Sequence, residues 1–358
     1  MAYEIREAKE QVIRAGLELL KSGLIARTWG NISARISDTQ FVITPSGMAY
    51  DRLGEGDLVT VNIADCSYEG SIKPSSEKGI HAAAYAHRPE VNFVIHTHQN
   101  FASAVSTLHV DLASGTIDPD TIPVLGKRVP AAEYGLSSTK KLTKSVEHAI
   151  VSNPESRAVL LVNHGTLCMG RDYEDAFNIA HVLEAVSEKR YRALCEGLIP
   201  TDVKPGYGIG SGEGGEDVEN DFSRYEKIYS GLPQGEKGFA ILSTAPFTME
   251  VSRLGKTMKA YIDDMAQICG ADVKCISGGE KAVEKALKGR RAVLLQGAGA
   301  ICISEEEDDA RAVAMVLEKN AMAAILKAAG DSPKPVNFLS ANLEHLIYEK
   351  KYSKLKNR

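Results

Sequence analysis

A repeat shared by the two halves of the chain restricts the possible fold more than any other feature of the sequence. The segment Arg-Ala-Val-Leu-Leu occupies residues 157–161 and recurs at residues 291–295, an offset of 134 positions. The same offset aligns further identical residues downstream: Cys168 with Cys302, Ala176 with Ala310, and Val182-Leu183-Glu184 with Val316-Leu317-Glu318. Because the match runs from an apolar strand into the following helix, it predicts that the second half repeats part of the first fold.

Upstream of these residues the repeat continues at an offset of 146, which aligns Ile95 with Ile241 and Phe101 with Phe247. The change of offset means that the second copy is shortened. Three histidines of the first half are replaced in it: His96, His98 and His164 align with Leu242, Thr244 and Ala298. We therefore expect a degenerate copy without these histidines, with a structural or regulatory role.

The length of the chain and a glycine-rich segment predict two domains. With 358 residues, of which 44% are hydrophobic, the chain can bury two cores. Residues 204–217 read Lys-Pro-Gly-Tyr-Gly-Ile-Gly-Ser-Gly-Glu-Gly-Gly-Glu-Asp, which has too few apolar side chains to order itself. We expect a first domain at residues 1–197, a linker at 198–237, and the degenerate copy with a C-terminal helical tail at 238–358.

Charge and hydropathy disfavour two classes of partner. The net charge of −5 provides no basic surface field of the kind that nucleic-acid binding requires. No apolar run approaches the roughly 20 residues that span a bilayer, and residues 1–7 lack the apolar stretch of a signal peptide. The six cysteines form no Cys-x-x-Cys pair, which is typical of reduced thiols. We expect a cytoplasmic protein that binds neither nucleic acid nor membranes.

Hydrophobic periodicity predicts the elements around a candidate site. Apolar residues at three- and four-residue steps indicate an opening helix over residues 3–22. Segments rich in β-branched residues and broken by Pro and Gly indicate strands and tight turns between residues 31 and 61. Two apolar runs, residues 92–96 and 158–162, are typical of buried strands.

Three histidines at predicted strand ends form a candidate metal site. His96 and His98 are two residues apart, so their side chains project from the same face of a strand. His164 follows the second buried strand, and Gly165 permits a sharp turn there. Three imidazoles with one open coordination position are typical of catalytic zinc, although manganese, cobalt or iron could substitute. The alternative of three unrelated core histidines is disfavoured, because the repeat accommodates other residues at the same positions.

Small polar residues predict a phosphate-binding site close to the histidines. Ser75 and Ser76 are placed to cap a helix, whose free N–H groups and dipole favour an anion. Glu77 would then lie in the first turn, where a carboxylate could transfer protons at a neighbouring carbon. Further hydroxyl, amide and backbone donors come from Asn31, Thr44, Ser46 and Gly47. Taken singly, each cluster could also be an ordinary cap or turn.

Five short motifs occur in the order found in the class II aldolase and adducin family, which the first half of the chain resembles. They are Gly-Asn-Ile-Ser, Thr-Pro-Ser-Gly, Pro-Ser-Ser-Glu, His-Thr-His and Asn-His-Gly, within about residues 5–195. The resemblance implies a three-layer α/β/α fold with a central, mainly antiparallel sheet, followed here by the shortened copy. It also implies zinc on His96, His98 and His164, an acid/base role for Glu77, and phosphate binding by Asn31, Thr44, Ser46, Gly47, Ser75 and Ser76.

The resemblance implies a metal-dependent lyase acting on a small phosphorylated sugar. The nearest functional analogues in the family are L-fuculose-phosphate aldolase and related pentulose-phosphate enzymes. Such an aldolase cleaves a ketose phosphate to dihydroxyacetone phosphate and an aldehyde through a metal-stabilised enediolate, which Glu77 would protonate. A 4-epimerase, a decarboxylase or a dehydratase would use the same scaffold, and a non-catalytic adducin-like binding module is the alternative outside enzymes.

Two departures from the family pattern bear on these expectations. Family members usually place a proton-donating Tyr in the segment that corresponds to residues 109–130, and no Tyr occurs there. Tyr134 matches a common family position that is better suited to a structural role. The second half also replaces the short C-terminal tail of the family. We expect a homo-oligomer, related to the cyclic tetramers of the family, with a subunit number that the extra half leaves open.

Overall fold

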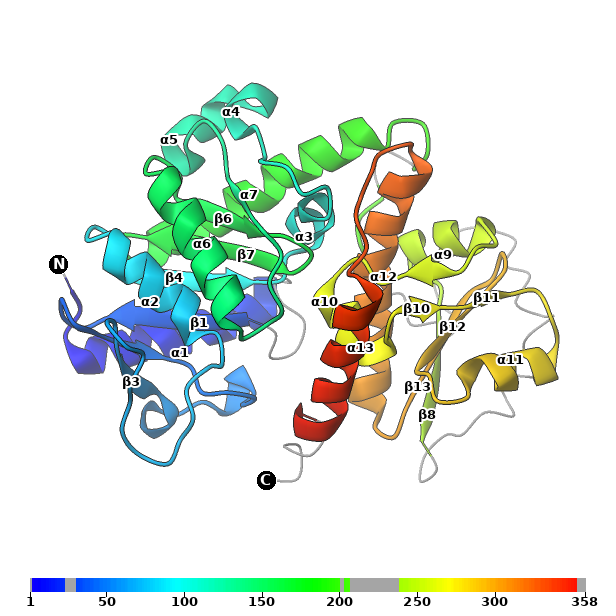
Figure 1. Cartoon of the computed structure of the whole chain (residues 1–358), viewed down its shortest axis with the longest axis horizontal. Coiled ribbons are helices and arrows are strands. Elements are labelled where there is room, and N and C mark those ends of the chain that lie inside the picture. Colours follow the sequence, from blue (N-terminus) through cyan, green and yellow to red (C-terminus); the bar gives the residue numbers. More distant parts are fainter. Residues whose placement is uncertain (1, 23–29, 200–202, 207–237, 353–358) are drawn as a thin grey trace. The chain divides into compact units, whose positions relative to one another are not determined.

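The structure, a computed structural model, shows a chain divided into two compact units, Met1–Tyr191 and Arg192–Arg358 (Figure 1). The residues that it describes are 2–22, 30–199, 203–206 and 238–352. Most of the predicted linker at 198–237 lies outside these residues. None of the described helices is both long and apolar enough to cross a membrane.

A seven-stranded sheet forms the centre of the first unit (Figure 1). Its strands lie in the order β3-β2-β1-β4-β7-β6-β5, and every neighbouring pair is antiparallel except β5 with β6. The mainly antiparallel sheet expected from the sequence is therefore confirmed. The strands are β1 (Gly30–Arg35), β2 (Gln40–Ile43), β3 (Val59–Asn62), β4 (Phe93–Thr97), β5 (Ala131–Ala132), β6 (Ala158–Leu161) and β7 (Gly165–Gly170).

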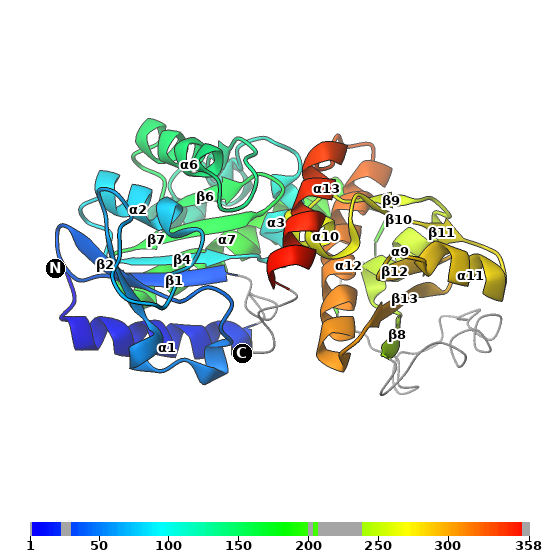
Figure 2. The ribbon, with the colours of Figure 1, turned by 60° about the horizontal axis from the view of Figure 1, so that its bottom comes forward.

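Helices cover both faces of this sheet and complete the α/β/α layers (Figure 2). On one face α2 and α6 pack over a buried core that includes Val94 of β4. On the other face, where α1 and α7 lie, the ring of Phe93 contacts the rings of Tyr3 and Tyr173. Successive residues of β4 thus face opposite layers, which explains why its sequence is apolar without interruption.

The helices of the first unit include the opening helix expected over residues 3–22. Their bounds are α1 (Ile5–Ser22), α2 (Lys78–His87), α3 (Asn100–Ser106), α4 (Ser114–Ile117), α5 (Ile122–Leu125), α6 (Lys140–Ser152) and α7 (Tyr173–Leu194), with 3₁₀ turns η1 (Tyr50–Arg52), η2 (Glu55–Asp57) and η3 (Pro119–Thr121).

The helix predicted to start at a serine cap begins later than expected. α2 starts at Lys78, and its N-cap is Glu77. Ser75 forms the preceding turn: its hydroxyl accepts a hydrogen bond from the N–H of Glu77, and its carbonyl accepts one from the N–H of Lys78. The predicted serine cap is therefore wrong in position, because the hydroxyl of Ser75 stabilises the turn that leads into the helix.

The second unit contains a four-stranded sheet in the order β11-β12-β13-β8 and a separate two-stranded pair, β10 with β9. Its strands are β8 (Phe239–Ser243), β9 (Met258–Lys259), β10 (Asp272–Val273), β11 (Cys275–Ile276), β12 (Ala292–Leu295) and β13 (Gly299–Ser304). Its helices are α9 (Pro246–Arg253), α10 (Asp263–Cys269), α11 (Glu280–Leu287), α12 (Glu307–Ala328) and α13 (Phe338–Ile347), followed by the short π-helix η5 (Tyr348–Tyr352).

Residues aligned by the sequence repeat occupy equivalent places in the two sheets. In the β6–β7 hairpin, Ala158 pairs with Cys168, and in the β12–β13 hairpin, Ala292 pairs with Cys302. The strand on the far side matches as well, because Cys168 pairs with Ile95 of β4 and Cys302 with Ile241 of β8. The order β8-β13-β12-β11 therefore parallels β4-β7-β6-β5, including the parallel pair at its end.

A glutamate ties the long helix to the short helix in each unit, and it is buried in the second. Glu184 of α7 accepts hydrogen bonds from the N–H groups of Phe101 and Ala102 at the start of α3, at 2.8 and 3.0 Å. Glu318 of α12 accepts them from Phe247 and Thr248 at the start of α9, at 3.0 and 2.7 Å. A carboxylate at a helix N-terminus satisfies free N–H groups and complements the helix dipole.

Glu318 should make the second unit less stable as the pH rises from about 5 to about 8. Burial raises the pKa of Glu318 from 4.5 to about 7, and the hydrogen bonds from Phe247 and Thr248 offset this only in part. The stabilisation from its bound proton is complete below pH 4.5 and is lost as the pH rises through about 7. Through this group alone, the free energy of unfolding should fall by up to roughly 3 kcal/mol.

Urea denaturation followed by circular dichroism at a series of pH values measures this fall. Glu318→Gln should flatten the pH dependence, whereas the exposed Glu305→Gln should leave it unchanged. An equally steep fall in Glu318→Gln would show that another group is responsible.

Candidate active site

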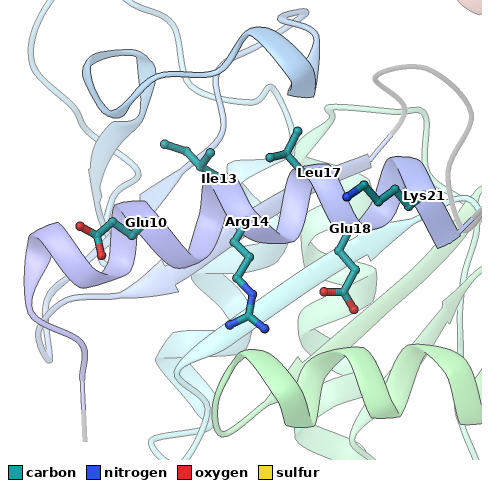
Figure 3. Close-up of a pocket in the computed structure, with 6 residues that line it drawn as sticks. All are labelled: Glu10, Ile13, Arg14, Leu17, Glu18 and Lys21. Carbon is teal, nitrogen blue, oxygen red and sulfur yellow. The ribbon is translucent and has the colours of Figure 1, made fainter.

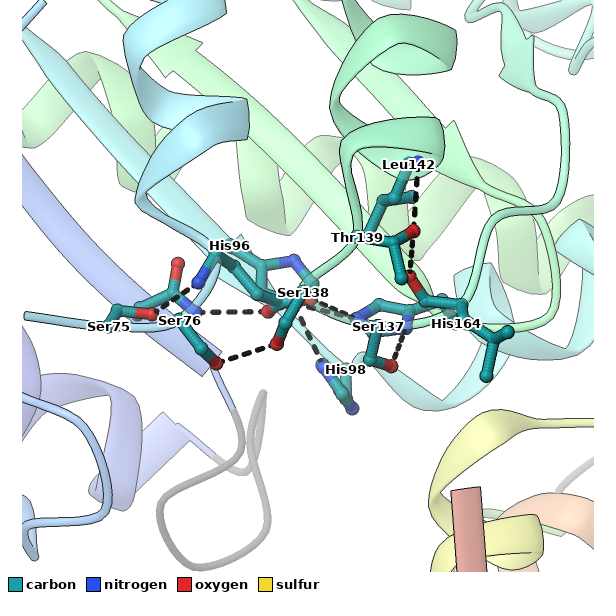
Figure 4. A network of polar contacts seen from close by, with 12 residues as sticks. Ser75, Ser76, His96, His98, Ser137, Ser138, Thr139, Leu142 and His164 are labelled. Atoms are coloured by element: carbon teal, nitrogen blue, oxygen red, sulfur yellow. Dashed lines mark hydrogen bonds and ion pairs between the residues drawn. The ribbon is translucent and has the colours of Figure 1, made fainter. Parts of the chain in front are cut away.

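Three buried imidazoles converge at the end of β4, as the sequence predicts (Figure 4). The Nε2 atom of His96 lies 3.0 Å from Nε2 of His98 and 3.2 Å from Nε2 of His164. Neutral imidazole nitrogens that face one another so closely repel through their lone pairs unless a cation lies between them. Two ligands bound tetrahedrally at roughly 2.05 Å from zinc would be about 3.3 Å apart, so the geometry fits a divalent metal ion.

The backbone around Gly165 holds the three rings together. His164 belongs to the tight turn between β6 and β7, in which its N–H donates to the carbonyl of Leu161 at 2.9 Å. A Cβ atom on Gly165 would lie 2.3 Å from the carbonyl oxygen of Thr97 and within 3.3 Å of the rings of His96 and His98. Only glycine therefore lets the turn that carries His164 approach the strand that carries the other two ligands.

Hydrogen bonds to the outer nitrogens orient two of the rings. The Nδ1–H of His96 donates to the carbonyl of Thr166 at 2.8 Å, which leaves Nε2 as the nitrogen with a free lone pair. Nδ1 of His164 lies 3.2 Å from Oγ of Ser137. The carbonyl of Thr166 favours the tautomer of His96 in which Nε2 can bind a metal ion, and the hydroxyl of Ser137 can accept from His164 in the same tautomer.

The carboxylate of Glu77 faces the same point as the histidines. Its Oε2 lies 3.1 Å from Nε2 of His96, and its Oε1 lies 3.2 Å from Nε2 of His164. Burial opposes ionisation of this carboxyl, but His164 and His96 outweigh it and hold the pKa of Glu77 well below its usual range. Glu77 is thus a carboxylate within reach of both a bound cation and a molecule that contacts that cation.

The structure brings part of the predicted phosphate cluster beside Glu77. The amide of Asn31 donates to Glu77 at 3.2 Å, and the N–H of Ser75 donates to the carbonyl of Thr44 at 2.9 Å. Ser76, which is exposed, accepts a hydrogen bond from the hydroxyl of Ser138 at 2.7 Å (Figure 4).

The other two predicted phosphate ligands belong to the turn that follows β2. The N–H of Ser46 donates to the carbonyl of Lys73 at 3.0 Å, and Gly47 has a φ of +77°. No hydrogen bond of these residues to the histidines or to Glu77 occurs within the described part of the chain.

Three residues at the site were not predicted from the sequence. Ser137 and Ser138 precede Thr139, which caps α6, so a run of three hydroxyl residues looked like an ordinary helix start. Ser138 has a φ of +64°, a conformation that the sequence gives no sign of. His81 is fully buried in α2, where burial lowers its pKa to about 3. The sequence does show that His81 lies four residues after Glu77, a spacing that places both on the same face of a helix.

A pocket on the surface of α1 has no histidine among its lining residues (Figure 3). It is lined by residues of a single helix: Glu10, Ile13, Arg14, Leu17, Glu18 and Lys21. Arg14 there stacks on Tyr173 and lies 3.9 Å from Glu174, which is consistent with packing between α1 and α7. We therefore assign the candidate active site to the histidine cluster.

Comparisons with known proteins identify the first half of the chain. The family model described as Class II Aldolase and Adducin N-terminal domain matches residues 10–191. A 5-deoxy-D-ribulose 1-phosphate aldolase of Bacillus thuringiensis is 30% identical over 202 residues, which are 55% of this chain and 92% of the relative. The L-ribulose-5-phosphate 4-epimerase UlaF of Salmonella paratyphi A is 31% identical over 211 residues, 55% of this chain and 91% of the relative. A solved L-fuculose 1-phosphate aldolase is 32% identical, covers 56% of this chain and 91% of its own, and has a TM-score of 0.48.

Replacement of one histidine should abolish tight metal binding. His164→Ala removes one of the three converging imidazoles, so the metal affinity should fall by more than the roughly 100-fold expected for an outer contact. Metal content after dialysis against a chelator, measured by mass spectrometry, tests this. His148→Ala, exposed on α6, is the matched control and should keep the wild-type content. Full metal retention in His164→Ala would exclude the three-histidine site.

Proposed function

The chain belongs to the class II aldolase and adducin family, and on that premise we propose that it is a metal-dependent lyase of the aldolase type. Its substrate would be a small ketose 1-phosphate of the L-fuculose-1-phosphate type, and its products dihydroxyacetone phosphate and an aldehyde. The observation that carries this proposal is the convergence of three Nε2 atoms with the Glu77 carboxylate 3.1 and 3.2 Å from two of them.

We propose zinc as the metal on His96, His98 and His164, with manganese, cobalt and iron as alternatives. Three neutral imidazoles suit zinc and leave its full charge uncompensated, and they leave a coordination position for substrate. A cation bound there would supply positive charge to the carbonyl and hydroxyl oxygens next to the bond that breaks. The surrounding residues orient the rings and exclude water, since all three imidazoles are buried.

The phosphate group would bind at the turn that leads into α2. The helix N-terminus presents N–H groups to an anion, and the hydroxyls of Ser75 and Ser76 lie in the turn before it. Asn31, Thr44, Ser46 and Gly47 complete the proposed set. Phosphate bound here would lie beside Glu77, which directly follows the two serines.

Glu77 would move the proton at the reacting carbon. In the cleavage direction it would protonate the carbon from which the aldehyde has departed, and in the reverse direction it would remove that proton. The hydrogen bond from the amide of Asn31 positions the carboxylate before substrate arrives. The group that exchanges a proton with the oxygen of the departing aldehyde is not assigned, because the segment 109–130 contains no Tyr.

A 4-epimerase that acts on a pentulose phosphate is the second candidate. The 31% identity to a protein named L-ribulose-5-phosphate 4-epimerase and the missing Tyr both favour it. A decarboxylase or a dehydratase would need the same cation and carboxylate. A purely structural, adducin-like role is disfavoured, because the three histidines and Glu77 are all retained and convergent.

We also propose that the first domain spans residues 1–197 and that residues 238–358 are a shortened, non-catalytic copy. The shared register of β6–β7 and β12–β13 supports this. The protein would act in the cytoplasm as a homo-oligomer, in keeping with the cyclic assemblies that the family resemblance implies.

Glu77→Gln should stop turnover while metal binding persists. The change keeps the shape of the side chain but removes its ability to carry a proton, so kcat should fall by about 100-fold or more. The assay couples release of dihydroxyacetone phosphate from a panel of ketose 1-phosphates to oxidation of a reduced nicotinamide. Glu69 is exposed and has no described hydrogen bond to the site, so the control variant Glu69→Gln should retain wild-type turnover. Bound metal without any release would replace the aldolase proposal by the epimerase, and a protein that binds no metal would refute both.

A further inference from the structure

A hydrogen-bonded chain behind Glu77 connects α2 to β1. Glu77, His81 and Tyr85 follow one another at four-residue steps along α2, so they share one face of the helix. Asn31 and Ser33 are two residues apart on β1, so they share one face of the strand. Apart from Glu77, which is about one-tenth exposed, every member of the chain is buried.

The contacts along this chain are short and continuous. The amide nitrogen of Asn31 lies 3.2 Å from Oε2 of Glu77, and its amide oxygen lies 2.5 Å from Nε2 of His81. Nδ1 of His81 lies 2.6 Å from Oγ of Ser33, which lies 2.8 Å from the hydroxyl of Tyr85. His81 therefore uses both ring nitrogens, and neither one faces the metal ligands directly.

The chemistry of the donors fixes the direction of the links from Glu77 to His81. The Glu77 carboxylate only accepts, so Asn31 must turn its NH₂ toward Glu77 and its oxygen toward His81. His81 must then donate from Nε2, which leaves Nδ1 as an acceptor for the Ser33 hydroxyl. The oxygen of Ser33 can in turn accept from Tyr85. Of the two neutral forms of His81, the one with its proton on Nε2 satisfies all of these contacts.

We infer that His81 is a positioning residue that acts through Asn31 to hold the Glu77 carboxylate against His96 and His164. Without the Nε2–H donor, the amide oxygen of Asn31 would lose its buried partner, and the amide would no longer be fixed in the orientation that donates to Glu77. The Glu77 carboxylate would then be held less firmly beside the histidines. The held geometry also leaves the second amide hydrogen of Asn31 pointing away from Glu77, as a donor for substrate.

Two amide substitutions at position 81 test the two ring nitrogens of His81 separately. A glutamine places its side-chain nitrogen near the position of Nε2, so His81→Gln keeps a donor for Asn31. An asparagine reaches only the position of Nδ1, so His81→Asn keeps a partner for Ser33 and loses the link to Asn31. Both variants bury a neutral amide of similar polarity, but asparagine is smaller and leaves a cavity, so the Asn31→Ala arm below, which leaves His81 in place, separates the lost link from lost packing.

The kinetic test rests on the proposed function. We expect His81→Asn to lower kcat by about 10- to 100-fold with KM changed by less than about 3-fold, and His81→Gln to stay within about 5-fold of wild type. Equal losses in the two variants, or no loss in either, would overturn the inference.

A spectroscopic test is independent of the substrate. With cobalt(II) as the probe metal, the visible spectrum senses the carboxylate that lies beside two of the three ligands. His81→Asn should reproduce the spectrum of Glu77→Gln, and His81→Gln should reproduce that of wild type. Wild-type spectra in both His81 variants would overturn the inference even if no substrate is found, whereas the expected spectra without any activity would leave it standing and refute only the proposed lyase.

Asn31→Ala provides a further arm if circular dichroism shows that the His81 variants do not fold. It removes the donor to Glu77 and leaves His81 in place. We expect its cobalt spectrum to match that of Glu77→Gln, and a wild-type spectrum would overturn the inference, because His81 is argued to act only through Asn31.

Discussion

The pairing of β4 with β7 is the constraint on which the rest of the first unit depends. His96 lies opposite Leu167, and Thr97 lies opposite Thr166. In this register His96 faces the layer of α2, while the two threonines share a hydrogen bond of 2.9 Å on the side of α7. Gln99 extends that contact to the carbonyl of Ala180 in α7. A slip of one residue would exchange the two faces and leave a histidine against the wrong helix layer.

The second unit shows which parts of this arrangement serve the fold and which serve the site. Ser243 and Ala300 stand where the first unit has Thr97 and Thr166, and the hydroxyl of Ser243 is buried with no hydrogen-bond partner among the described residues. The second unit therefore lacks the equivalent of the threonine contact as well as the three aligned histidines. Glu318 is present in it, where its side chain accepts from the first N–H groups of α9. The glutamate is thus common to both units, whereas the threonine pair accompanies the histidine cluster.

Local patterns predict the strands, the three histidines and Glu77, because each depends on residues close in sequence or on the repeat. The three histidines were accessible in this way: His96 and His98 share a strand face, and the repeat aligns His164 with Ala298. His81 was not, because its four-residue spacing from Glu77 does not distinguish it from a core histidine until Asn31 is seen opposite it. Ser137 was missed for the same reason, since only the folded chain shows that its hydroxyl meets His164.

The close approach at Gly165 recurs at Gly299, where a Cβ atom would lie 2.2 Å from the carbonyl of Ser243. The hairpin therefore reaches the same closed geometry in a unit that has no ligands to draw it together. In zinc fingers, by contrast, the ion itself drives the chain to fold. This hairpin geometry therefore does not depend on a bound ion. If the proposed metal binds at His96, His98 and His164, it would enter a site that the backbone has already formed, and its supply would limit activity without limiting folding.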